Sequence, residues 1–178
     1  MTQTRIVFSG SGGQGVITAA LILAEAAVLF ENLNAVQSQD YSSEVRGGAT
    51  RSDVIISNTD IYFPKVIQPN VLVCLTQGAY IKFRSLIRPG GLLLTDSRFV
   101  TVEKKVDARQ MQLPLWETVM KTIGNPIVLN ICMLGAVVGL TKLVRPASVE
   151  KVLEKRLAAG VIDMNKKALS LGVALGEK

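Results

Sequence analysis

The sequence predicts an α/β fold: a three-layer sandwich around a mixed, mostly parallel sheet, ending in a helical C-terminal part. Short runs rich in β-branched residues alternate with apolar runs of helical length through residues 4–95, which is the rhythm of such a sandwich. A glycine-rich loop separates the first short run from the first long one. Beyond residue 114 the pattern is mainly helical. The predicted architecture is therefore Rossmann-like.

Each element has its own local signal. Asn58 and Thr59 read as a two-residue turn, which predicts an antiparallel hairpin. A Pro-Gly-Gly run at 89–91 ends a helix, and Pro146 fits the first position of another, whose apolar face carries Val149 and Val152. The expected strands are 4–9, 34–38, 50–57, 60–63, 71–75, 92–95 and one near 101–106; the expected helices are 16–31, 79–86, 115–123 and three after the break at 124–126.

Composition limits the classes of function. The chain has 178 residues, 48% of them apolar and 19% charged, which fits one globular domain over 1–178. Aromatic residues make up only 5% and the Lys and Arg residues are scattered, so we expect no nucleic-acid partner. The net charge of +6 favours acidic partners or phosphates instead.

Histidine is absent from the sequence, which excludes Ser-His and Cys-His nucleophile pairs and imidazole bases. Cys74 and Cys132 lie far apart within apolar runs, so both are expected to be buried thiols rather than metal, cluster or disulfide residues. We therefore assign no catalytic and no metal-binding residue. The N-terminus shows no signal peptide, which fits a cytoplasmic protein.

The longest apolar run, 127–140, is shorter than the roughly 20 residues that span a bilayer, so it predicts a buried helix and no membrane partner. Gly135 and Gly139 within it would allow close approach to the sheet or to another subunit, and core packing is the favoured reading. Together with the apolar helix 16–29, this run suggests more hydrophobic surface than a small domain hides, so we expect a stable complex with partner chains and self-association of the isolated chain.

Two glycine-rich motifs carry the chemistry. The loop Gly10-Ser11-Gly12-Gly13-Gln14-Gly15 stands between a strand and a helix, where backbone N–H groups and the helix dipole attract an anion. It also satisfies the dinucleotide fingerprint, but the next strand offers no acidic residue except a late Asp40. A stand-alone NAD- or FAD-binding oxidoreductase therefore remains an alternative.

The second motif is Ser42-Ser43-Glu44-Val45-Arg46-Gly47-Gly48. Its Arg46 would give a bidentate charged contact to a phosphate or carboxylate, and Glu44 would orient a cation. Alternatively, Gly47 and Gly48 only form a tight turn. Asp96 and Ser97 follow a strand at the ligand-binding edge of such a sheet, although capping of the next segment is their favoured role.

The two motifs together resemble the gamma subunit, or gamma domain, of the 2-oxoacid:ferredoxin (or other acceptor) oxidoreductases. These proteins open with a strand and a G-x-G-G-Q-G loop and continue with S-x-E-x-R-G-G, matched here by Ser42, Glu44, Arg46, Gly47 and Gly48. The resemblance covers nearly the whole chain and is specific up to about Leu94. Ser11 and the Glu-Val-Arg-Gly-Gly run look most like the 2-oxoglutarate enzyme.

The resemblance implies a complex subunit that is inactive alone. The family oxidises 2-oxoacids to acyl-coenzyme A with thiamine diphosphate, magnesium and [4Fe-4S] clusters, but this sequence has no Gly-Asp-Gly motif and lacks cluster cysteines. Those cofactors are expected in alpha, beta and ferredoxin-like delta partner subunits. Coenzyme A would be shared at the active site of the complex, held by Gly10, Ser11, Gly12, Gly13, Gln14, Gly15, Glu44, Arg46, Gly47 and Gly48. A purely structural assembly subunit is the second alternative.

Overall fold

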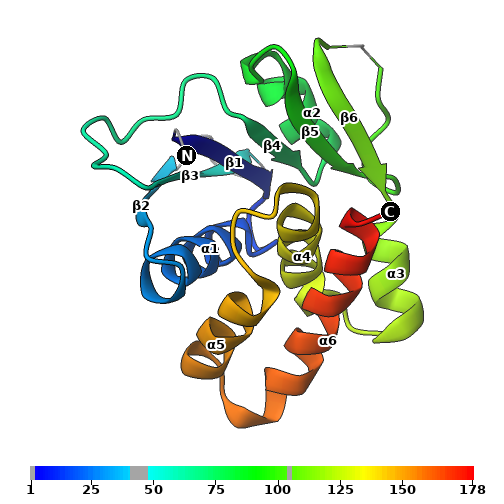
Figure 1. The fold of residues 1–178 in the computed structure, drawn as a ribbon. Coiled ribbons are helices and arrows are strands. Elements are labelled where there is room, and N and C mark those ends of the chain that lie inside the picture. The colour runs from blue at the N-terminus through cyan, green and yellow to red at the C-terminus, as the bar shows by residue number, and fades with distance from the viewer. Residues whose placement is uncertain (1–2, 41–47, 104–105) are drawn as a thin grey trace.

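The computed structural model describes residues 3–40, 48–103 and 106–178. Within them a six-stranded sheet has the order β2-β3-β1-β4-β5-β6 (Figure 1). β3 runs antiparallel to both of its neighbours, whereas β1, β4, β5 and β6 are mutually parallel. The predicted mixed, mostly parallel sheet is confirmed. The strands are β1 (Thr4–Ser11), β2 (Asn34–Asp40), β3 (Ala49–Ser57), β4 (Val71–Cys74), β5 (Gly91–Asp96) and β6 (Ala108–Leu113).

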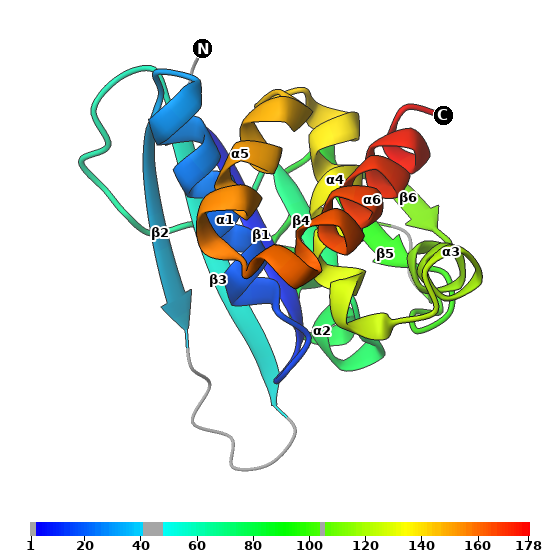
Figure 2. The same cartoon turned by 90° about the horizontal axis from the view of Figure 1, so that it is seen from below.

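Helices cover both faces of the sheet and complete three layers (Figures 1 and 2). Alternate β1 residues face the two sides: Ile6 and Phe8 belong to one buried cluster and Val7 to the other. The first cluster contains α1 (Val16–Phe30), α3 (Leu115–Thr122), α4 (Leu129–Thr141), α5 (Pro146–Arg156) and α6 (Ala159–Gly176). The second contains α2 (Gln77–Phe83). Short 3-10 turns stand at Arg84–Leu86 and Pro126–Val128.

The apolar run 127–140 forms α4, which is buried on all sides. Its glycines allow close approach, but to α6 rather than to the sheet or another subunit. A Cβ at Gly139 would meet the Val173 backbone, and one at Gly172 would meet the Ala136 N atom at 2.8 Å. α1 is likewise packed in the core. α4 therefore leaves no surplus apolar surface, but Val28 and Leu29 of α1 are 48% and 52% exposed, so the expected self-association stays a prediction.

The predicted strand 60–63 and its hairpin do not form. β3 already pairs with β1 on one side and β2 on the other, so no free edge remains beside it. The Ser57 hydroxyl accepts from the Thr59 N–H at 3.0 Å and turns the chain away locally. The predicted antiparallel pairing does occur in this region, but β3 forms it with β1 and β2.

In the described part of the predicted strand near 101–106, residues 101–103 and 106 form no strand, and the sixth strand lies at Ala108–Leu113 instead. Thr101 bonds to the Gln77 side chain at the start of α2 instead: its N–H donates to Gln77 Oε1 at 2.8 Å. β6 is an edge strand, paired on one side only, with β5. An edge strand tolerates polar side chains, and Arg109, Gln110 and Gln112 interrupt the apolar alternation by which strands are recognised in a sequence.

Candidate ligand site at the carboxyl edge of the sheet

The chain reverses its winding between two neighbouring strands. From β1 it crosses one face of the sheet through α1 to reach β2, whereas from β4 it crosses the other face through α2 to reach β5. In open α/β sheets, ligands bind outside the carboxyl ends of strands at such a switch point. The loop Gly10–Gly15 follows β1 and therefore lies at this position. Leu75, which follows β4, donates its N–H to Ser9 O at 2.9 Å.

The glycine loop is held by its own glutamine. Gln14 Oε1 accepts from the Ser11 N–H at 2.7 Å, and the Gln14 N–H donates to Ser11 O at 3.3 Å. A Cβ at Gly10 would collide with this amide and approach Val16 Cγ1 to 3.3 Å. Gln14 therefore shapes the loop with its oxygen, which leaves its Nε2 group as the part that could serve a ligand.

The tip of the loop is open. Gly12 and Gly13 are exposed, and a Cβ at either would meet nothing within 4 Å. Positive φ angles occur at Gly13 (85°) and Gly15 (71°) but not at Gly12. Gly15 occupies the N-cap position of α1 and has no side chain that could accept a hydrogen bond from the first N–H groups of the helix. An open turn at an uncapped helix start offers backbone donors to an anion.

Asn130 supports the loop from α4, and sequence reasoning missed this role. Its side chain is almost buried, donates from Nδ2 to Gly15 O at 3.3 Å and accepts from the Ile131 N–H at 3.0 Å. A Cβ at Gly15 would lie 2.9 Å from Asn130 Cγ. The available signal was a lone polar residue inside the apolar run 127–140.

Of the second motif, the structure describes only Gly48. Ser11 of the glycine loop pairs with Ala49 at the start of β3. Gly48 directly precedes Ala49 and therefore lies beside the glycine loop. Ser42, Glu44, Arg46 and Gly47 lie outside the described residues. Their proposed roles stay predictions.

Asp96 caps the neighbouring loop, in agreement with its favoured role. It is fully buried, with Oδ1 accepting from the Arg98 N–H at 2.8 Å and Oδ2 from the Trp116 N–H at 2.7 Å. Burial raises the pKa of this carboxyl above its ordinary value, although these backbone donors oppose the shift. The Ser97 N–H donates to Leu113 O at 2.9 Å. Both residues thus tie β5 to the end of β6 and the start of α3.

Both thiols are buried, as the sequence predicts. Burial raises the pKa of Cys74 and of Cys132 to about 12, so neither is a reactive thiolate at neutral pH. Among the described residues, no group of three His, Cys, Asp or Glu side chains could hold a metal ion. The same residues include no helix that is long and apolar enough to cross a membrane.

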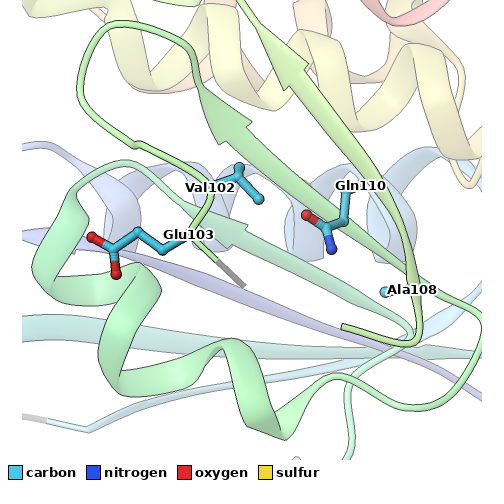
Figure 3. A pocket seen from close by; sticks show the side chains of 4 residues that line it. All are labelled: Val102, Glu103, Ala108 and Gln110. Atoms are coloured by element: carbon cyan, nitrogen blue, oxygen red, sulfur yellow. The ribbon is translucent and has the colours of Figure 1, made fainter. Parts of the chain in front are cut away.

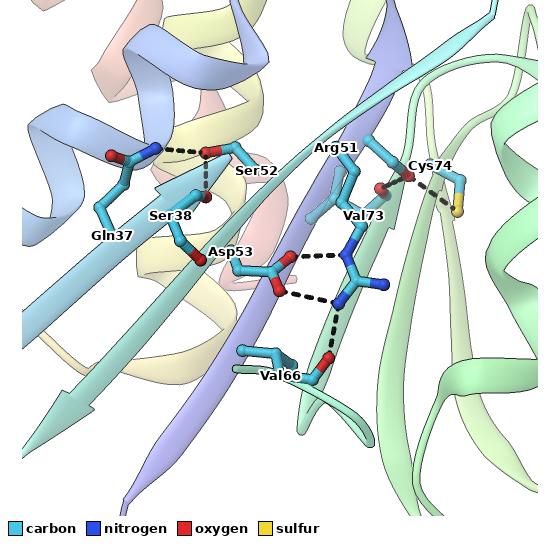
Figure 4. A network of polar contacts seen from close by, with 9 residues as sticks. Gln37, Ser38, Arg51, Ser52, Asp53, Val66, Val73 and Cys74 are labelled. Atoms are coloured by element: carbon cyan, nitrogen blue, oxygen red, sulfur yellow. Dashed lines mark hydrogen bonds and ion pairs between the residues drawn. The ribbon is translucent and has the colours of Figure 1, made fainter. Parts of the chain in front are cut away.

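Two cavities lie away from the glycine loop. One of about 440 Å³ is lined by Val102, Glu103, Ala108 and Gln110 (Figure 3). Another, of about 520 Å³, includes Arg51 and Asp53 in its wall. Arg51 is already occupied there: it forms two bonds to Asp53, at 2.6 and 2.8 Å, and donates to Val66 O (Figure 4). Neither wall contains a loop glycine.

Comparisons with known proteins identify the family. Residues 5–175 match the family model described as pyruvate ferredoxin/flavodoxin oxidoreductase. The chain is 43% identical to the 2-oxoglutarate synthase subunit KorC of Methanocaldococcus jannaschii over 97% of its own length and 94% of that protein.

Two solved structures share the fold. The gamma subunit of a keto/oxoacid ferredoxin oxidoreductase from Geobacter sulfurreducens superposes with a TM-score of 0.91 at 37% identity, covering 99% of this chain and 97% of that one. A 2-oxoglutarate:ferredoxin oxidoreductase from Magnetococcus marinus, with 2-oxoglutarate, coenzyme A and succinyl-CoA bound, gives 0.89 at 22% identity, covering 99% of this chain and 31% of that one. The chain belongs to the pyruvate ferredoxin/flavodoxin oxidoreductase family, as a gamma-type subunit most like that of the 2-oxoglutarate enzyme.

Proposed function

We propose that the chain helps a multi-subunit 2-oxoglutarate:acceptor oxidoreductase bind coenzyme A as the acyl acceptor. The observation that carries this proposal is the open, glycine-lined turn at the uncapped start of α1, located at the switch point of the sheet. Such a turn suits the phosphate groups of coenzyme A. A relative of the same fold was solved with coenzyme A bound.

In this proposal the chain binds and orients, and it performs no redox step. The backbone amides of Gly12 and Gly13 contact a phosphate, and Gln14 adds its Nε2 donors. Arg46 pairs with a second anionic group, Glu44 orients it, and Gly47 and Gly48 let the backbone approach. Holding the acyl acceptor in position lowers the entropic cost of the transfer step.

Thiamine diphosphate, magnesium and [4Fe-4S] clusters do not fit the described residues. Both cysteines are buried and no acidic cluster is present there. We therefore place these groups in the alpha, beta and delta partners and derive no step through them from this chain.

Gly12→Val tests the loop. The new side chain would project into open space at a position without positive φ, so folding and assembly should stay intact while the ligand is blocked. Gly160→Val is the matched control, because its Cβ also meets nothing within 4 Å, far from the loop in α6. Titration of coenzyme A into the assembled enzyme should show that Gly12→Val lowers the affinity by about tenfold or more, whereas Gly160→Val leaves it unchanged.

If the assembled Gly12→Val enzyme binds coenzyme A with wild-type affinity, the loop is only a tight turn, and a purely structural assembly subunit is favoured. Binding of NAD or FAD by the isolated chain would favour the stand-alone oxidoreductase.

Arg46→Ala tests the second motif. Loss of one charged hydrogen bond should weaken use of coenzyme A by about 1.5–3 kcal/mol, measured as kcat/KM at limiting coenzyme A in the intact complex. Unchanged kinetics would show that Arg46 does not contact the ligand and would favour the alternative in which Gly47 and Gly48 only form a tight turn.

A further inference from the structure

The connection between β3 and β4, residues 58–70, exposes large apolar side chains. Tyr62 is 87% exposed, Phe63 57% and Ile67 67%. The connection lies at the edge of the sheet where β1 and β4 begin, opposite the glycine loop (Figure 1). Exposed apolar side chains gathered on one segment mark an interaction surface.

The segment that carries these side chains is anchored to the domain. Val66 is buried, and its carbonyl accepts from Arg51 Nη2 at 2.5 Å (Figure 4). Asn70 bonds to Arg5 in both directions: its N–H donates to Arg5 O at 2.7 Å, and its Oδ1 accepts from the Arg5 N–H at 2.9 Å. The end of the segment that carries Ile67 is therefore fixed to the domain, which lowers the entropic cost of binding there.

Three cations lie in two adjoining hollows beside Phe63 and Ile67. A hollow of about 250 Å³ is lined by Arg5, Phe63, Lys65, Ile67 and Gln68. An adjoining hollow of about 410 Å³ shares Arg5 and Gln68 and adds Arg88.

None of these three cations forms an ion pair with a carboxylate of the described residues, whereas Arg51, Arg145, Arg156 and Lys166 all do. We define Arg5, Phe63, Lys65, Ile67 and Arg88, which line these two hollows, as the basic apolar patch.

We propose that the basic apolar patch is the docking surface for another subunit of the same oxidoreductase, whose contacting face is apolar and bordered by carboxylates. Unpaired cations around an apolar centre call for an acidic rim on the partner. A second copy of this chain is disfavoured, because a two-fold contact would bring the same cations against one another. Docking here leaves the glycine loop free, so the proposal rests on the subunit assignment and not on coenzyme A binding.

The experiment measures assembly of variant chains with the other oxidoreductase subunits, purified as a co-expressed complex. Phe63→Ser with Ile67→Ser removes apolar contacts, and Lys65→Glu with Arg88→Glu reverses the charged rim. Val161→Ser is the matched apolar control, because Val161 is also exposed but lies on α6. All these side chains are exposed, so the melting temperature should stay near that of the wild type.

We expect both double variants to weaken association by about tenfold or more, and the control to leave it unchanged. Wild-type association should weaken with added salt, and the charge-reversed variant should lose that dependence. Complexes that still form at high concentration should bind coenzyme A as the wild type does, which separates this proposal from the previous one.

Association of both double variants at wild-type affinity overturns the proposal. Two further results would also overturn it: a wild-type homodimer that Phe63→Ser with Ile67→Ser abolishes, and binding to anionic phospholipid vesicles that Lys65→Glu with Arg88→Glu abolishes while subunit assembly persists.

Discussion

A single side chain, Asn130, connects the start of α4 to the cap of α1. Its amide donates to Gly15 O, which also accepts the Ala19 N–H at 3.0 Å. Since Gly15 has a φ of 71°, the loop depends at this residue both on backbone freedom and on the space left by Asn130.

A double-mutant cycle separates those two requirements. Gly15→Ala should destabilise the fold through left-handed strain, about 1–2 kcal/mol, plus collision with Asn130. In an Asn130→Ala background the collision with the amide is removed and only the strain and a 3.1 Å approach to the Cβ of residue 130 remain, so the cost of Gly15→Ala should fall. Urea unfolding of the four proteins measures the coupling. Strict additivity of the two changes would contradict the predicted collision.

Glu31 stabilises the junction of α1 and α5. It accepts from the Arg145 N–H at 2.8 Å and from the Ser148 hydroxyl at 2.5 Å. Burial opposes ionisation of this carboxyl, but the hydrogen bonds from Ser148 and Arg145 and the charge of Arg145 outweigh it, so the pKa of Glu31 lies below its ordinary value. Its contribution to stability is therefore present above the unfolded pKa of about 4.3 and is lost as the pH falls through the lower folded value.

Glu31→Gln should lower the free energy of unfolding at pH 7 by about 1–3 kcal/mol, and the difference should shrink below a pH of about 4. Chemical denaturation across the pH range measures it. Glu177→Gln is the control, because Glu177 belongs to an exposed pair with Lys142 that contributes little. A constant difference between pH 3 and pH 7 would contradict the assigned ionisation.

At the scale of elements, the contact between α4 and α6 depends on glycines from both helices. Gly135 and Gly139 meet the α6 backbone, and Gly172 and Gly176 meet the α4 backbone. This close approach covers one side of the apolar helix that carries Asn130.

Gly172→Ala should force the two helices apart, since its Cβ would lie 2.8 Å from Ala136 N, and should cost about 1–3 kcal/mol or more. Gly160→Ala, in the same helix but in open space, should be neutral or stabilise by up to about 1 kcal/mol. Thermal melting of the pair measures the contrast. Equal effects of the two substitutions would show that the helices can adjust without loss.

At the scale of the whole molecule, the glycine loop follows the carboxyl end of β1, whereas the connection that carries Phe63 and Ile67 lies at the opposite edge of the sheet, where β1 and β4 begin. Because both cysteines are buried and the described residues hold no cluster of metal-binding side chains, we expect the purified chain to be colourless and to show no turnover of 2-oxoglutarate with a dye acceptor. Visible spectra and a dye-linked assay of the isolated chain measure this, with the assembled enzyme as the positive control. Turnover by the chain alone would contradict its role as a partner subunit.

The sequence by itself determined the α/β class, the strand-to-helix position of the glycine loop, the buried thiols and the family. These follow from local signals: periodicity, glycine spacing and residue types that a metal or a nucleophile would need. The helix start at Pro146 was likewise predictable, because proline at the first helical position is a local rule.

Only the tertiary structure decided which distant residues meet. β3 fills the space between β1 and β2, which removes the edge that strand 60–63 would have needed. Asn130 reaches Gly15 across 115 positions of sequence, and the exposure of Phe63 beside the buried Val66 depends on what packs behind the connection. Local pattern cannot encode such contacts, because each is set by long-range packing of elements whose sequences carry no mark of their neighbours.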